Sequence, residues 1–180
     1  FYPESFIYII QFSMKFTSGN FLYLLTIAFS LTSLSFTNVQ VASSNKEFDE
    51  IIDAWHHAAA TGDSVGFLSR MTEDALYLGT DETERWTRTT MGKDLGKFFN
   101  GKKAWHFIAY NRIYTALDDK NTILFDESLK TWMGPCKSTG MMRKVKGKWL
   151  ISYYNLNVAV SNAVVQNYLK LLKEEEILKD

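Results

Sequence analysis

A change of pattern near residue 105 constrains the fold of this chain more than any other feature. From there on, four segments rich in aromatic and β-branched residues follow one another, at 105–117, 122–133, 136–145 and 149–160. Such runs, separated by short polar turns, predict strands joined as hairpins. The Gly-Pro pair between the second and third runs predicts a bend or bulge. Three helices followed by consecutive strands indicate an α+β domain with an antiparallel sheet.

The helical part of the pattern precedes residue 100. The motif at 44–47, Ser-Asn-Lys-Glu, is a capping box, and the helix that it begins is expected to end at Gly62. A short second helix follows. A strand at 75–80 and a polar loop at 81–86 then lead to a third helix at about 87–99, where apolar residues recur at helical spacing.

The front of the chain has the features of a leader. Residues 1–43 contain a plausible start at Met14, one lysine, an apolar run at 21–36 and a stretch of small residues. This arrangement predicts a secretory signal peptide, cleaved after Ser43 or, alternatively, Ser35. The run is shorter than the roughly 20 residues that a spanning helix needs. We therefore expect a secreted or periplasmic protein without stable membrane insertion; the alternative is an uncleaved N-terminal membrane anchor.

The rest of the chain predicts one domain, at 44–162, followed by an amphipathic C-terminal helix at 163–180. The 20 basic residues balance the 20 acidic ones, and no basic stripe occurs, so a nucleic-acid partner is not expected. The single cysteine, Cys136, excludes an intrachain disulfide. Adjacent His56 and His57 diverge by about 100° on a helix, so no metal site is expected. No phosphate-binding loop occurs, and no cofactor is expected.

An acid pair interrupts the second predicted strand. Asp126 and Glu127 must point to opposite faces, and Glu127 shares its face with Phe125 and Leu129. A carboxylate among apolar neighbours indicates a pocket, a buried partner or both. In a pocket, desolvation would raise the pKa of Glu127 and suit it to general acid or base chemistry. The alternative is a structural acid held by an arginine or a tryptophan N–H.

Two further groups of polar residues are candidates. His56 lies beside the apolar stripe of the first helix. From there it could reach the pocket rim or bind Glu127; the alternative is a structural histidine. Asp81, Arg85 and Trp86 follow a strand. Arg85 could neutralise Glu127 or hold a ligand carboxylate; alternatively, an Asp–Arg pair braces the loop while Trp86 seals the core.

Aromatic residues make up 15% of the chain. Most must lie in the core, but a few lining a cavity would suit a flat, mostly apolar ligand, oriented by N–H and O–H groups. The candidate catalytic residues are thus Glu127 and His56. The predicted ligand-binding residues are Tyr77, Asp81, Arg85, Trp86, Trp105, Trp132 and Asn155.

Several motifs resemble a SnoaL-like branch of the nuclear transport factor 2-like superfamily, from about residue 48 to 162. They are Trp55-His-His-Ala-Ala-Ala-Thr-Gly-Asp63, Gly79-Thr-Asp-Glu-Thr-Glu-Arg-Trp86, Phe125-Asp-Glu127, Gly134-Pro-Cys136 and Tyr154-Asn-Leu156. The resemblance implies a cone: a strongly curved antiparallel sheet packed on about three N-terminal helices, with a pocket at its open end. Tyr153 stands where the branch often has histidine, which puts histidine-based chemistry there in doubt.

The resemblance leaves the function open, because relatives include polyketide cyclases, ketosteroid isomerase, dehydratases and non-catalytic binding domains, and the branch itself has no assigned reaction. The first hypothesis is an exported protein that binds a small, mostly apolar or aromatic molecule. The second is a cofactor-independent isomerase, cyclase or dehydratase that uses Glu127 as general acid or base. The third is a homodimerising module, with an interface formed by Leu150, Leu156, Val158 and Val160.

Overall fold

The computed structural model describes residues 41–42, 45–99, 105–175 and 177. The expected start, apolar run and cleavage sites of the leader lie outside these residues. Within the described part of the chain, no helix is both long enough and apolar enough to cross a bilayer.

The helices begin and end at local signals in the sequence. The side chain of Asn45 caps the first of them by accepting a hydrogen bond from the Phe48 N–H. The predicted cap, Ser44, was therefore wrong by one residue. Gly62, with a φ of 71°, ends this helix, and Asp63 caps the next. The helices are α2 (Lys46–Thr61), α3 (Ser64–Ser69), α4 (Arg88–Phe98) and α5 (Val165–Glu174).

The strands form a single sheet in the described residues, with the order β1-β4-β5-β6-β7-β2-β3. Neighbouring strands from β4 to β7 pair antiparallel, as their hairpin spacing predicted. The sheet is mixed rather than antiparallel throughout, because β2 pairs with β7 in parallel. The bounds are β1 (Val41–Ala42), β2 (Met71–Leu78), β3 (Arg85–Thr87), β4 (Ile108–Ala116), β5 (Thr122–Thr131), β6 (Gly134–Val145) and β7 (Lys148–Val158).

Differences from the predicted strands lie at the edge of the sheet. Strand β2 starts at Met71 rather than residue 75, and the predicted loop at 81–86 contains the start of β3. Strand β3 has three residues and pairs with the end of β2. A strand this short has too few residues to show an alternating pattern in the sequence.

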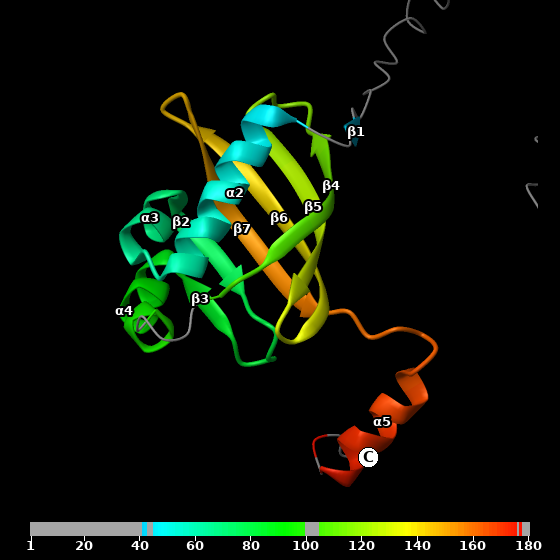
Figure 1. Cartoon of the computed structure of the whole chain (residues 1–180). Coiled ribbons are helices and arrows are strands. Elements are labelled where there is room, and N and C mark those ends of the chain that lie inside the picture. The colour runs from blue at the N-terminus through cyan, green and yellow to red at the C-terminus, as the bar shows by residue number, and fades with distance from the viewer. Residues whose placement is uncertain (1–40, 43–44, 100–104, 176, 178–180) are drawn as a thin grey trace, which may run out of the picture. The chain divides into compact units, whose positions relative to one another are not determined.

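The sheet curves around α2, which lies across its inner face (Figure 1). Register shifts in β2, in β4 and between β6 and β7 accompany this curvature, as β-bulges do. The core lies between α2 and the sheet, with α3 and α4 closing one side. Its most buried large side chains are Ile52, Trp55, Phe67, Met91, Leu95, Leu129, Met142, Ile151 and Tyr154. The predicted α+β fold, with a curved sheet on N-terminal helices, is confirmed.

A bulge in β4 determines which side chains of that strand face the core. Tyr110 pairs with Ser128 and Ile113 pairs with Asp126, so two β4 residues, Asn111 and Arg112, lie opposite Glu127 alone. Asn111 has a φ of 52° and lies in the left-handed region that asparagine tolerates better than most residues. The extra residue changes the alternation, and Arg112 turns inward.

Candidate functional site

The carboxylate of Glu127 lies at the centre of the inner face, with none of the residue exposed. Its Oε1 accepts hydrogen bonds from His56 Nε2 at 2.7 Å, Ser138 Oγ at 3.1 Å and the Tyr154 hydroxyl at 3.1 Å. Its Oε2 accepts one from Arg112 Nε at 2.8 Å. The inward direction of Glu127 and its contact with His56 agree with the sequence analysis. All four donors come from different elements, so this carboxylate links α2 to three strands.

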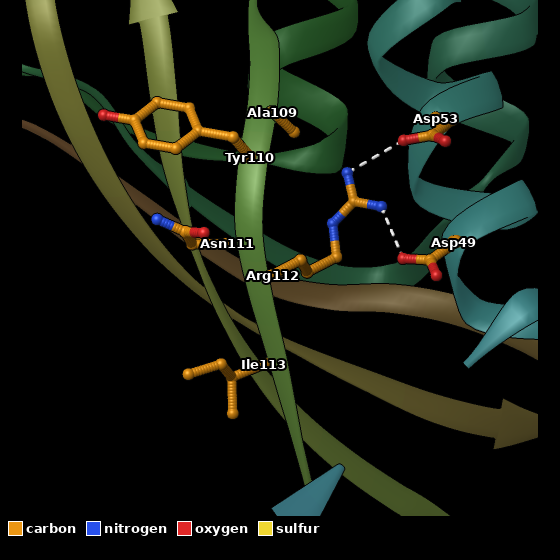
Figure 2. A pocket seen from close by; sticks show the side chains of 7 residues that line it. All are labelled: Asp49, Asp53, Ala109, Tyr110, Asn111, Arg112 and Ile113. Atoms are coloured by element: carbon orange, nitrogen blue, oxygen red, sulfur yellow. Dashed lines mark hydrogen bonds and ion pairs between the residues drawn. The ribbon is translucent and has the colours of Figure 1, made fainter. Parts of the chain in front are cut away.

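Arg112 connects the buried carboxylate to the surface. Its Nη1 donates to Asp49 Oδ1 and its Nη2 to Asp53 Oδ1, each at 2.9 Å (Figure 2). The Tyr114 hydroxyl also donates to Asp49, at 2.6 Å. One guanidinium therefore binds three carboxylates, and we call Arg112, Glu127, Asp49 and Asp53 the arginine cluster. No motif in the sequence marked Arg112, because the bulge alone brings it inward.

The electrostatics of Glu127 are opposite to the expectation. Burial by itself would raise the pKa of Glu127, but the hydrogen bonds and positive charge that His56 and Arg112 provide outweigh it and hold the pKa at about 2. Burial likewise raises the pKa of Asp49, but the hydrogen bonds from Tyr114 and Arg112 lower it by more. The pKa of Asp49 therefore lies below its ordinary value. The raised pKa, which was expected for a carboxylate in an apolar pocket, was wrong because Arg112 could not be identified from the sequence as a partner of Glu127.

This arrangement restricts what Glu127 can do chemically. Three donors surround Oε1, Arg112 binds Oε2, and no part of the residue is exposed to a substrate. A general base needs a free acceptor within reach of the substrate and a pKa nearer to the working pH. The geometry therefore fits the structural alternative, an acid held by an arginine.

A surface pocket of about 700 Å³ lies beside the arginine cluster. Figure 2 shows Arg112 turned towards Asp49 and Asp53 on α2, while Tyr110, Asn111 and Ile113 point to other sides of β4. Because consecutive β4 residues line the pocket, it follows the edge of this strand, which β1 pairs only at Tyr114 and Thr115. The pocket is lined by Asp49, Asp53, Ala109, Tyr110, Asn111, Arg112 and Ile113.

Three of the predicted ligand-binding residues come together at the other end of the domain. The Tyr77 ring lies 6.0 Å from Trp86 and 5.7 Å from Trp105, between ring centroids. Phe98 joins them, at 5.3 Å from Trp105 and 6.1 Å from Trp86. Tyr77 is buried and the other three are half-buried. We call these four side chains the aromatic wall.

The remaining predicted residues lie elsewhere. Asp81 and Arg85 are exposed, and Asp81 accepts hydrogen bonds from Thr83 rather than pairing with Arg85. The cation beside Glu127 is Arg112, so the possibility that Arg85 neutralises Glu127 is not met. Trp86 donates its Nε1–H to Asp94 at 3.2 Å and packs against the core, as the alternative for this residue predicted.

Residues of the hairpins also separate. Trp132 is 80% exposed in the turn between β5 and β6. On β7, Tyr154 points inward and Asn155 is half-buried on the opposite face. Leu156, predicted for a dimer interface, is 3% exposed and belongs to the core. Cys136 is a buried free thiol. Within the described ranges, no group of three His, Cys, Asp or Glu residues could hold a metal ion.

The curved sheet wrapped on an N-terminal helix is a nuclear transport factor 2-like α+β fold. Residues 49–161 match the SnoaL-like domain family, and the chain belongs to this family. A comparison with curated proteins found no match.

Solved structures with this fold share little sequence with the chain. A nuclear transport factor 2-like protein of unknown function from Pseudomonas putida is 11% identical, with 65% of this chain and 87% of that chain covered and a TM-score of 0.54. One from Cytophaga hutchinsonii is 12% identical (62% and 95%, TM-score 0.54). A protein with a cystatin-like fold from Nostoc punctiforme is 13% identical (64% and 91%, TM-score 0.53). At these identities the likeness concerns the fold.

Proposed function

We propose that this SnoaL-like protein binds a small, mostly apolar or aromatic molecule at the aromatic wall and performs no reaction through Glu127. The observation that carries the proposal is the half-exposure of Trp86, Phe98 and Trp105, grouped around the buried ring of Tyr77. Large rings that are fully packed lose their water contact; these three keep apolar surface available to a flat ligand.

A buried donor near the wall supports a ligand that also carries an acceptor. Trp55 is 1% exposed, and its Nε1–H has no hydrogen-bond partner among the residues that the structure describes. Its ring lies 6.1 Å from that of Tyr77. A buried N–H without an acceptor is costly. A carbonyl or carboxylate oxygen on a ligand that enters beside Tyr77 would satisfy it.

The same geometry disfavours the enzymatic alternative. An isomerase, cyclase or dehydratase that used Glu127 would need its carboxylate to contact the substrate. That carboxylate is instead buried and hydrogen-bonded to four protein donors. Glu127 instead positions α2 against the sheet. We also propose, from the apolar run at 21–36, that the protein acts after export; N-terminal sequencing of the mature protein would test this.

Binding can be tested with a matched pair of tryptophan variants. Native mass spectrometry would first detect a co-purified molecule, and calorimetric titration with 2-naphthoate would then measure affinity. Trp105→Ala should weaken binding by roughly tenfold or more, since it removes one ring of the wall. Trp132→Ala removes the same ring from an exposed turn and should leave affinity unchanged. Equal affinities for the two variants, or no binding by wild type, would refute the proposal.

A further inference from the structure

The outer face of the sheet carries a partly exposed apolar row. Leu124 pairs with Met141, Met141 with Tyr153, and Tyr153 with Leu76, so the row crosses β5, β6, β7 and β2. Their chain neighbours, among them Phe125, lie in the core, and alternation therefore directs the row outward. Leu124 is 39% exposed and the other three are half-buried. We call these four residues the outer apolar row.

The C-terminal helix α5 has an apolar stripe of its own. At 100° per residue, Val165, Tyr168, Leu169 and Leu172 fall within one third of its circumference. Lys170 and Glu174, which form an ion pair at 3.7 Å, lie on the opposite side. No residue of α5 is buried, and Tyr168 and Leu169 are 43% and 36% exposed. A ten-residue helix is marginal in water unless its apolar face packs against something.

The connection between the two surfaces is short and contains a turn. Backbone pairing of β7 ends when Ala159 donates to Pro135, and Val164 then donates to Ser161 across a turn directly before α5. Six residues, 159–164, separate β7 from α5. A link of this length spans up to about 20 Å, whereas packed layers lie roughly 10 Å apart, so it can carry α5 onto the face of the sheet. We propose that α5 folds back over its own domain and buries its stripe on the outer apolar row.

The lengths of the two elements agree with this arrangement. From Val158 back to Tyr153 is about 17 Å along β7, and a helix of ten residues is about 15 Å long. A helix about 10 Å wide covers two strands, so α5 over β6 and β7 covers Met141 and Tyr153. A second copy of the chain could occupy the same row, but the short link keeps α5 at an effective concentration in the millimolar range. The helix therefore outcompetes a second copy at ordinary protein concentrations.

Oxidation of Met141 by dilute hydrogen peroxide measures whether the row is covered. Met142 is fully buried on the opposite face and reports any general unfolding in the same sample. Leu169→Asp places a charge in the α5 stripe, whereas Asn167→Asp places the same charge on its polar side. Leu169→Asp should raise the Met141 oxidation rate at least about threefold and leave Met142 unchanged. Asn167→Asp should alter neither rate.

Hydrogen exchange of α5 in the full chain gives a second reading. If α5 packs on the sheet, its backbone amides should exchange at least about tenfold more slowly than those of an unstructured segment. Leu169→Asp should remove this protection. The Met141 oxidation rate and the exchange protection of α5 should both be unchanged on tenfold dilution of the protein, because the contact is intramolecular. Three results would overturn the proposal: an unprotected α5 in wild type, equal Met141 oxidation in wild type and Leu169→Asp, or protection that falls on dilution, which would assign the row to a second copy.

Discussion

At the scale of single residues, one guanidinium determines how the inner face is held together. Arg112 binds Glu127, Asp49 and Asp53, so it compensates a buried charge and two charges nearer the surface. A buried ion pair contributes little compared with an apolar core, but removal of one partner leaves the other charge buried and unpaired. The stability of this domain should therefore depend more on Arg112 than on any ion pair at its surface.

Replacement of Arg112 tests this dependence. Arg112→Met keeps the aliphatic volume and removes the charge and all its hydrogen bonds, so the free energy of unfolding should fall by about 3–5 kcal/mol, measured by urea denaturation. The control is Lys137→Met, which breaks the exposed pair with Asp126 at 3.6 Å and should cost at most about 1 kcal/mol. Similar losses in both variants would show that Glu127 does not need its arginine.

The sequence predicted one half of this interaction. Strict alternation in β5 placed Glu127 inward beside Phe125 and Leu129, because that strand is regular. Arg112 could not be predicted in the same way, since alternation in β4 changes at the bulge. The choice between a catalytic and a structural acid depended on that missing partner, and so did the direction of the pKa shift.

At the scale of elements, bulges and close contacts position the strands. The β4 bulge requires a residue that tolerates a positive φ, and Asn111 meets this requirement. Strand order was predictable from β4 to β7, where short turns join neighbours. The β2–β7 pair was not, because four strands and a helix lie between these two strands in the sequence.

The bulge can be tested at Asn111. Asn111→Val puts a β-branched residue at a φ of 52°, so unfolding free energy should drop by roughly 1–2 kcal/mol. Asn111→Gly relieves the conformation and should be tolerated. The control, Asn157→Val, lies exposed in β7 with ordinary extended backbone and should change stability by less than about 0.5 kcal/mol. If both valine variants behave alike, the bulge carries no conformational requirement.

Strands β5 and β6 make a contact that only glycine permits. A Cβ on Gly140 would clash with the ring of Phe125, the residue paired with it. Gly140→Ala should therefore cost about 1–3 kcal/mol in a denaturant titration, and adding Phe125→Leu should recover part of the loss. Gly96→Ala, on α4 with open space around it, should instead stabilise by roughly 1 kcal/mol. Strictly additive effects of the two β-strand substitutions would argue against this contact.

At the scale of the whole molecule, the cluster links folding to pH. The pKa of Glu127 in the folded protein is about 2, below the ordinary value of 4.5. A depressed pKa means that the unfolded chain takes up the proton first as pH falls. The stabilisation is therefore complete above about pH 4.5 and is lost progressively towards pH 2. Its size is on the order of 3 kcal/mol, at about 1.4 kcal/mol for each unit of pKa.

A comparison of wild type with Glu127→Gln isolates this contribution. At pH 7 the variant should be less stable, because Arg112 loses the one buried carboxylate among its three charged partners. As pH falls from 5 to 2.5, wild type should lose stability faster, and the difference in unfolding free energy between the two proteins should shrink. Asp49, whose pKa is also lowered, is present in both and largely cancels. Urea titrations at pH 7, 4 and 2.5 measure the difference; a constant value across that range would mean that Glu127 is not the charged centre of the fold.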